Sequence, residues 1–341
     1  MYMRVIGEGS YGCVTNPSIR CSDKSVKNYT NKVSKIMHKK HALQEYKELS
    51  KITKIPGIEK FIISMPSICK PSMNSIFHDV IRDCENSKFP KMREDSFRIL
   101  VFDNGGVNLS EFMKNAYPKM APKELFIFWT NVVKLIDGLI FFRQKNIIHQ
   151  DLKAQNIVYN VLTGDMRFID FGKLTSHQTM IRLCTQSRNN EAHKWFNYPP
   201  EFEYSNKNDF VAKKVHWVYS EFLQKMADTF DSYSIGIMMA ELIQNRRHPG
   251  IASAFLKEAF QLFSEMGNTN LQLRSSDLAD FKERYVRLLK LHDMYAPNLP
   301  EPTEEILQIA KKTKMISSSE IKKISKLVGG YRRKTSKHKS A

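Results

Sequence analysis

The sequence contains few cysteines and no CxxC pair. Its five cysteines, Cys13, Cys21, Cys69, Cys84 and Cys184, are an odd number at irregular spacing. This argues against a disulfide framework and against a structural zinc site, because both need paired cysteines at recognisable spacing. We therefore expect reduced thiols.

Long apolar runs are missing as well. The most apolar stretch, 125–142, is interrupted by Asn131, Lys134 and Asp137, and it falls short of the roughly 18 to 20 apolar residues that a membrane span needs. We expect a buried helix there and no membrane partner. Residues 1–10 lack the apolar segment of a secretory signal, so the prediction for location is intracellular.

Positive charge is in excess and is unevenly distributed along the chain. Hydrophobic residues make up 42% and charged residues 26% of the chain, which is ordinary for a globular protein. The net charge is +18, and the segment 311–341 holds eleven Lys or Arg against one acid, Glu320. That composition is typical of a disordered tail. It is either a solvated tail or a basic arm that contacts nucleic acid without sequence preference.

Hydrophobic periodicity divides the chain into a strand-rich part and a helical part. The first hundred residues read as strands with one helix at about 40–54 and a polar loop before a strand at 97–102. A helix over 122–143, a strand pair joined at 163–165 and helices from 231 onward come next. We predict an α+β fold with a strand-rich domain at 1–104, a helical domain at 105–310, a cleft between them and a tail at 311–341.

Glycines at the N-terminus indicate a phosphate-binding turn. The pattern is Gly7, Gly9 and Gly12, followed by Val14, and it lets backbone N–H groups approach a polyphosphate. A dinucleotide-binding fold uses a similar pattern, but a helix should follow it and an acid should come about twenty residues later. Here a strand follows and Asp23 is too early, so the dehydrogenase interpretation weakens.

A lysine and a glutamate come next, in an order that suits a nucleotide site. Lys35 on a predicted strand can supply a positive charge to phosphates, and Glu45 on the next helix can hold its ammonium. Each has an ordinary alternative as a solvated surface charge. Because Lys35 and Glu45 follow the glycine turn in this order, the nucleotide-site interpretation is favoured for both residues.

Three oxygen-bearing side chains lie within a stretch of twenty residues. They are Asp151, Asn156 and Asp170. Magnesium takes hard oxygen ligands together with substrate phosphates, and a carboxylate left free can orient a hydroxyl nucleophile. Lys153, two residues after Asp151, is placed to stabilise charge on a transferring phosphoryl group.

These motifs together resemble the eukaryotic-type protein kinases. The matching segments, in the order of that family, are GEGSYGCV (7–14), KVSK (32–35), HQDLKAQN (149–156), DFGK (170–173), NYPPE (197–201) and DSYSIG (231–236). The resemblance covers residues 1–243. It implies a bilobal fold and transfer of the γ-phosphate of ATP with Mg²⁺.

The resemblance also implies a role for each matching residue. Asp151 would be the catalytic base, Lys153 would assist transfer, and Asn156 and Asp170 would bind magnesium. The nucleotide-binding set would be Gly7, Gly9, Gly12, Val14, Lys35, Glu45, Phe102, Asp103, Asn104 and Val158, with Val14 and Val158 flanking adenine. The assignment of Phe102 leaves open a shift of two residues to Leu100.

Details of the family motifs refine the predictions of regulation, substrate class and source. Gln150 replaces the Arg that pairs with an activation-loop phosphate, which argues against control by phosphorylation of Thr185 or Ser187. Lys153 favours a Ser/Thr kinase acting on protein substrates. The missing Arg and the short GGVNL segment resemble the divergent kinases of large DNA viruses, which implies a host-cytoplasmic protein packaged in the virion.

Two other functional classes stay open. One is a pseudokinase that acts as a binding module, against which the intact Lys35, Asp151, Asn156 and Asp170 argue. The other is a nucleic-acid-binding structural protein, which rests only on the basic tail and the overall charge. The sequence does not determine the oligomeric state.

Overall fold

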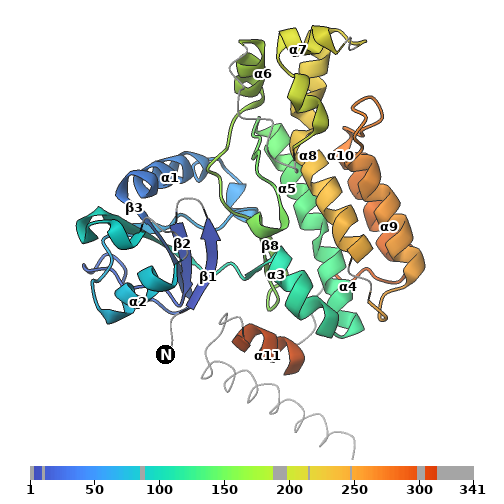
Figure 1. The fold of residues 1–341 in the computed structure, drawn as a ribbon. Helices are drawn as coiled ribbons and strands as arrows, with labels where there is room; N and C mark the ends of the chain where they lie inside the picture. The colour runs from blue at the N-terminus through green and yellow to red at the C-terminus, as the bar shows by residue number, and fades with distance from the viewer. Residues whose placement is uncertain are drawn as a thin grey trace, which may run out of the picture. The chain divides into compact units, whose positions relative to one another are not determined.

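A computed structural model of the protein describes most of the chain and divides it into two compact units. The strand-rich unit comprises 1–106 and 300–341, and the helical unit comprises 107–299 (Figure 1). The described residues are 4–9, 12–84, 89–186, 198–213, 216–245, 248–297 and 304–312. The predicted basic tail therefore lies outside them from residue 313 onward.

One antiparallel sheet forms the centre of the strand-rich unit, in the order β1-β2-β3-β5-β4. Its strands are β1 (Arg4–Gly9), β2 (Gly12–Asn16), β3 (Lys32–His38), β4 (Ser67–Cys69) and β5 (Phe97–Asp103). In the register, Lys35 on β3 faces Val14 on one side and Leu100 on the other. The central strand thus fixes Lys35 in the middle of the sheet.

The strand-rich unit also contains three helices, and one of them was not expected. They are α1 (Lys39–Ile52), α2 (Ser75–Asp83) and α11 (Glu304–Lys312), with 3₁₀ turns at Ile58–Lys60, Phe89–Lys91 and Glu94–Ser96. The prediction of a polar loop before residue 97 is wrong at α2. Asn74 caps this helix by accepting a hydrogen bond from the Phe77 N–H, and Phe77, Val80 and Ile81 bury one helical face.

The expectation of reduced cysteines is also wrong for four of the five. Disulfides join Cys13 to Cys84 and Cys21 to Cys69, across 71 and 48 residues of chain, while Cys184 is free and buried. Spacing along the sequence could not reveal these pairs, because the fold brings together cysteines of segments that are far apart in the chain.

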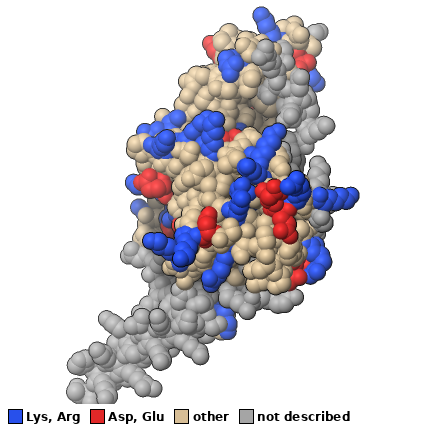
Figure 2. Space-filling view, turned by 90° about the vertical axis from the view of Figure 1, so that its left-hand side faces the viewer, with Lys and Arg blue, Asp and Glu red and all other residues tan. Residues whose placement is uncertain are grey.

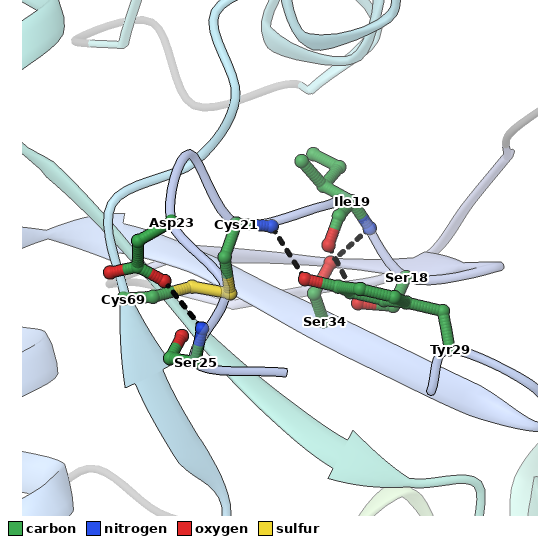
Figure 3. The surroundings of a disulfide bond; sticks show 8 residues. All are labelled: Ser18, Ile19, Cys21, Asp23, Ser25, Tyr29, Ser34 and Cys69. Atoms are coloured by element: carbon green, nitrogen blue, oxygen red, sulfur yellow. Dashed lines mark hydrogen bonds between the residues drawn. A yellow bond between two sulfur atoms is a disulfide. The ribbon is translucent and has the colours of Figure 1, made fainter. Parts of the chain in front are cut away.

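Backbone pairing explains how Cys21 and Cys69 meet. The Ser22 N–H donates to the Lys70 carbonyl (2.9 Å) and the Ser72 N–H donates to the Arg20 carbonyl (2.8 Å), forming a short antiparallel bridge. Figure 3 shows the disulfide beside this segment, with the Tyr29 hydroxyl accepting from the Cys21 N–H at 2.7 Å.

The helical unit contains a small sheet and a set of packed helices. The sheet order is β6-β7-β8, and β7 pairs with β8 as the predicted hairpin, Ile157 facing Phe168. Its strands are β6 (Val107–Asn108), β7 (Ile157–Asn160) and β8 (Asp165–Phe168). The helices are α3 (Leu109–Glu111), α4 (Pro122–Asn131), α5 (Val133–Gln144), α6 (His177–Thr185), α7 (Lys207–Ala212), α8 (Tyr219–Asn245), α9 (Ser253–Met266) and α10 (Leu278–Leu291). Shorter helical turns are Phe112–Ala116, Tyr117–Lys119, Ala154–Asn156 and Pro200–Tyr204.

The apolar stretch after Pro122 forms α4 and α5 in succession. At the start, the Glu124 carboxylate accepts from the Ala121 N–H (2.9 Å), which together with Pro122 fixes the first turn. The segment Pro122–Gln144 is long and apolar enough to pass a length and hydropathy test for a membrane span, but 61% of its most apolar window is buried inside the protein. Core helices pass the same test.

Two glycines let α8 and α9 approach closely. A Cβ on Gly236 of α8 would lie 2.3 Å from the Gly267 nitrogen, and one on Gly267 would lie 2.7 Å from the Ile237 nitrogen. Any larger residue would push the helices apart, so this contact requires glycine on both sides. Figure 1 shows α8, α9 and α10 packed as neighbours.

Candidate active site

The strand-rich unit holds Lys35 in an ion pair. The Lys35 ammonium lies 2.9 Å and 2.7 Å from the two carboxylate oxygens of Glu45 on α1. The two side chains are only 18% and 14% exposed. The predicted contact between these residues is therefore present. Because both oxygens of the Glu45 carboxylate accept from the Lys35 ammonium, they restrict the direction in which the lysine side chain points.

The glycine turn has a packing requirement besides any role toward phosphate. Gly9 on β1 pairs with Gly12 on β2, and Ser10 and Tyr11 between them lie outside the described residues. A Cβ on Gly12 would lie 2.2 Å from the Ile36 carbonyl oxygen. Glycine is thus needed for β2 to lie against β3. A Cβ on Gly7 would meet Val14 at 3.8 Å, an ordinary contact.

The predicted adenine-side residues lie on β2, at the end of β5 and on β7. Val14 is half-buried on β2, and Val158 is buried on β7 in the helical unit. Asp103 accepts from the Lys32 ammonium (2.5 Å), and the Asn104 side chain accepts from the Gly106 N–H (3.1 Å). Phe102 packs with Leu100, which is fully buried.

In the helical unit, Asp151 lies at the centre of a polar cluster. Its Oδ2 accepts from the Lys153 ammonium at 2.9 Å and from the Asn156 amide at 3.0 Å. The same amide also donates to the Asp151 backbone carbonyl at 2.8 Å. Asp151 is only 7% exposed, so its carboxylate has a fixed orientation.

A buried carboxylate on α8 holds the backbone of this loop. Asp231 accepts from the His149 N–H at 2.7 Å and from the Gln150 N–H at 3.1 Å. Gln150 has a φ of 65°, so the loop turns sharply here and exposes two backbone donors to one side chain. Burial raises the pKa of Asp231 to about 7, against the effect of these two hydrogen bonds.

His149 packs beneath the loop rather than facing solvent. Its ring lies 4.7 Å from that of Phe171, and its Nε2 lies 3.0 Å from the Ile169 carbonyl oxygen. Burial lowers the pKa of His149, although the Asp170 and Asp151 carboxylates act in the opposite direction. A neutral ring that donates to this carbonyl fits these surroundings.

The donor set at Asn156 and Asp170 fits a magnesium ion. Asp170 is exposed and has a φ of 64°, and Gly172 beside it leaves room, since a Cβ there would lie 3.4 Å from Asp170 Oδ1. Asn156 uses its amide nitrogen on Asp151, so its carbonyl oxygen is the atom that could ligate a metal. A carboxylate and an amide oxygen are the hard ligands that Mg²⁺ takes.

Sequence reasoning gave no role to Lys173, which also contacts Asp151. Its ammonium lies 3.7 Å from Asp151 Oδ1 and 5.6 Å from the centre of the Tyr198 ring. Lys173 directly follows the DFG segment, and only its proximity in space reveals the contact.

Arg274 is a second residue that the sequence did not reveal. Its guanidinium donates to both carboxylate oxygens of Glu201, at 2.5 Å and 2.9 Å, and to the Thr229 hydroxyl at 3.2 Å. Both charged side chains are fully buried. The pair ties the segment 198–201 to the helices, and a lone Arg more than seventy residues away carries no sequence signal for it.

Comparison with known proteins identifies relatives by sequence. A probable serine/threonine-protein kinase (yakA) of Dictyostelium discoideum is 33% identical over 91 residues, which is 26% of this chain and 6% of that protein. Mitogen-activated protein kinase 4 of Arabidopsis thaliana is 24% identical over 172 residues, 50% of this chain and 38% of that protein. Cyclin-dependent kinase G1 of the same plant is 28% identical over 140 residues, 41% and 19% respectively.

The matched regions thus span less than half of each of these relatives. The protein kinase domain family matches residues 1–292. That span includes both units' candidate residues, from Gly7 to Arg274. The chain belongs to the protein kinase family.

Proposed function

We propose that the protein is a serine/threonine kinase that transfers the γ-phosphate of ATP to hydroxyl groups of protein substrates. The observation that supports this most directly is the fixed Asp151 carboxylate, held by Lys153 and Asn156 on a loop anchored by Asp231. Such a carboxylate can accept the proton of a Ser or Thr hydroxyl as that oxygen attacks phosphorus.

Each remaining residue has a definite part in this proposal. Lys35, oriented by Glu45, pairs with the α- and β-phosphates, and backbone N–H groups of the glycine turn bind the phosphate chain. Lys153 stabilises charge on the transferring phosphoryl group. Asn156 and Asp170 would hold magnesium, which when bound neutralises charge on the phosphate oxygens.

The direct test measures transfer of labelled γ-phosphate from magnesium-ATP to a generic protein substrate and to the enzyme itself. Asp151→Asn should lower the rate by roughly 10² to 10⁴, the contribution typical of a general base. Asp165→Asn is the matched control, because Asp165 also pairs with a lysine of the helical unit, Lys134 at 2.9 Å. Equal loss in both variants, or label that survives Asp151→Asn, would refute the role of Asp151.

A second test addresses the metal. Asp170→Ala should abolish magnesium-dependent transfer while leaving the fold intact, because Asp170 is an exposed side chain. Circular dichroism and a thermal midpoint would check the fold. Unchanged turnover would remove Asp170 from the metal site.

Regulation, location and source stay predictions from the sequence. Gln150 predicts that phosphatase treatment leaves activity largely unaltered. Thr185, at the end of α6, donates to the Ile181 carbonyl at 2.8 Å. Ser187 lies outside the described residues. We further propose an intracellular protein of a large DNA virus, present in the host cytoplasm and packaged in the virion.

A basic arm that contacts nucleic acid also stays a prediction, because the segment beyond residue 312 lies outside the described residues. On the face drawn in Figure 2, Lys and Arg side chains are set among uncharged residues with Asp and Glu between them. This visible face shows no continuous basic patch among its described residues.

A further inference from the structure

The Asp151 carboxylate has two oxygens in different situations. Oδ2 accepts two hydrogen bonds, from Lys153 and Asn156. Oδ1 is buried and has no hydrogen-bond partner among the described residues. A buried carboxylate oxygen without a hydrogen bond is costly, so this oxygen is the one that is ready to receive a donor.

Lys173 lies beside that oxygen. Its ammonium is 3.7 Å from Oδ1, which is an ion-pair distance but too long for a hydrogen bond. The ammonium nitrogen is buried too. Lys173 is therefore an ion-pair partner of Oδ1 that makes no hydrogen bond to it, and a substrate hydroxyl that donates to Oδ1 competes with this ammonium for the same oxygen.

Tyr198 gives the ammonium a second favourable contact in the same position. The Lys173 nitrogen lies 5.6 Å from the centre of the Tyr198 ring, a cation–π distance. Tyr198 belongs to the segment just before Glu201, which the Arg274 pair fixes to the helices. Lys173 thus has an aromatic neighbour besides Asp151.

We propose that Lys173 is a specificity-determining residue that selects acceptor sites with an acidic residue next to the target Ser or Thr. The carboxylate of that Asp or Glu takes the Lys173 ammonium as its ion-pair partner. The ammonium then leaves Oδ1, and the target hydroxyl can donate its hydrogen bond there. This inference rests on the proposed function, because it assumes phosphoryl transfer with Asp151 as base.

The reaction remains balanced with this exchange. The hydroxyl oxygen forms a bond to the γ-phosphorus while the bond between that phosphorus and the β-bridging oxygen breaks, and ADP leaves. The hydroxyl proton goes to Asp151. Lys173 keeps its proton throughout and only changes its counter-ion, so its effect falls on the choice of acceptor.

Two peptides and three enzymes test the proposal. One peptide carries Glu on both sides of a single serine, and the other has Gln at the same positions. The enzymes are the wild type, Lys173→Met and Lys282→Met. The last is a matched control, because Lys282 pairs with Asp137 in the same unit and has 38% side-chain exposure against 34% for Lys173.

We expect the wild type to prefer the acidic peptide by roughly tenfold or more in kcat/KM, the size of one charge-assisted contact. Lys173→Met should bring that ratio close to one, with an unchanged KM for ATP. Lys282→Met should keep the wild-type ratio. If Lys173 had only a structural role, Lys173→Met would lower kcat/KM for both peptides by the same factor and leave their ratio unchanged.

The outcomes separate this inference from the proposed function. Transfer by the wild type with equal kcat/KM for both peptides overturns the inference alone. A preference that survives in Lys173→Met also overturns it. Absence of transfer to either peptide and to the enzyme itself overturns the proposed function and the inference with it. Thermal midpoints of Lys173→Met and Lys173→Gln check folding, and either folded variant suffices.

Discussion

The two units stabilise their candidate residues by different means. In the strand-rich unit, Lys35 lies in the middle of a sheet in which two disulfides join strands β2 and β4 to segments outside the sheet. In the helical unit, the loop that carries Asp151 is held by hydrogen bonds from the His149 and Gln150 N–H groups to the buried Asp231, and the segment 198–201 is held by the buried Arg274–Glu201 pair. Cross-links stabilise a fold largely by restricting the unfolded chain. Removing one partner of a buried polar network instead destabilises the folded state, because the other partner is left buried without its counterpart.

The largest effect on stability should come from breaking the buried ion pair. Glu201→Gln leaves the Arg274 guanidinium buried beside a neutral amide, so we expect a loss of about 3–5 kcal/mol in the free energy of unfolding. Denaturant titration would measure it. Glu203→Gln is the control, because Glu203 is exposed two residues away, and it should change stability by less than about 0.5 kcal/mol. Similar values for the two variants would contradict the comparison.

Removing a cross-link should have the next largest effect, and only in the strand-rich unit. The Cys21→Ser, Cys69→Ser double variant opens a closed loop of 48 residues, which should cost about 2–4 kcal/mol. Hydrogen exchange read by mass spectrometry should show faster exchange in peptides from 1–106 and no change in those from 107–299.

A reductant supplies the control for this prediction. It should lower the stability of the wild type more than that of the double variant, because the variant has lost one of the bonds that the reductant breaks. Alkylation and intact mass would count the thiols. Five free thiols in the untreated protein would contradict the cross-links.

A smaller effect on the free energy of unfolding should depend on pH and arise from two buried groups of the helical unit. Because burial lowers the pKa of His149, the unfolded chain takes up a proton near pH 6.5 that the folded protein does not. Stability from this group is therefore complete above pH 6.5 and is lost as pH falls, by up to about 1.4 kcal/mol per pH unit. Asp231 acts in the opposite direction, since its raised pKa makes stability fall as pH rises from about 4 to 7.

A comparison of variants isolates the histidine. The wild type should lose more stability than His149→Phe between pH 6.5 and pH 5.5, measured by denaturant titration. His216→Phe, which replaces an exposed histidine of the same unit, should follow the wild type. Parallel curves for the wild type and His149→Phe would contradict a buried neutral His149.

The smallest effect should come from an exposed ion pair. Arg287 and Glu283 on α10 lie 2.8 Å apart, but their side chains are 73% and 72% exposed. Arg287→Ala should therefore cost only about 0.3–0.5 kcal/mol, measured at low and high salt. A loss comparable to that of Glu201→Gln would mean that burial does not decide the strength of these pairs.

The sequence predicted the local features of the site but not all of its long-range partners. Gly12, Lys35, Asp151 and Asp170 lie in short motifs whose chemistry can be read from neighbouring residues. Arg274, Lys173 and the disulfide pairs act through contacts that only the fold creates. The same limit explains α2, whose three buried residues form too short a pattern to stand out from a polar segment.

Within one short interval, helix α8 makes three of the contacts that organise the helical unit. Thr229 receives the Arg274 guanidinium, Asp231 receives the loop at His149 and Gln150, and Gly236 contacts Gly267. Each residue inserted into a helix rotates the remainder of that helix by about 100° and shifts it by about 1.5 Å. A single insertion or deletion between Thr229 and Gly236 would therefore misdirect at least one of the three contacts. This interval of α8 therefore fixes the helix in length as well as in sequence.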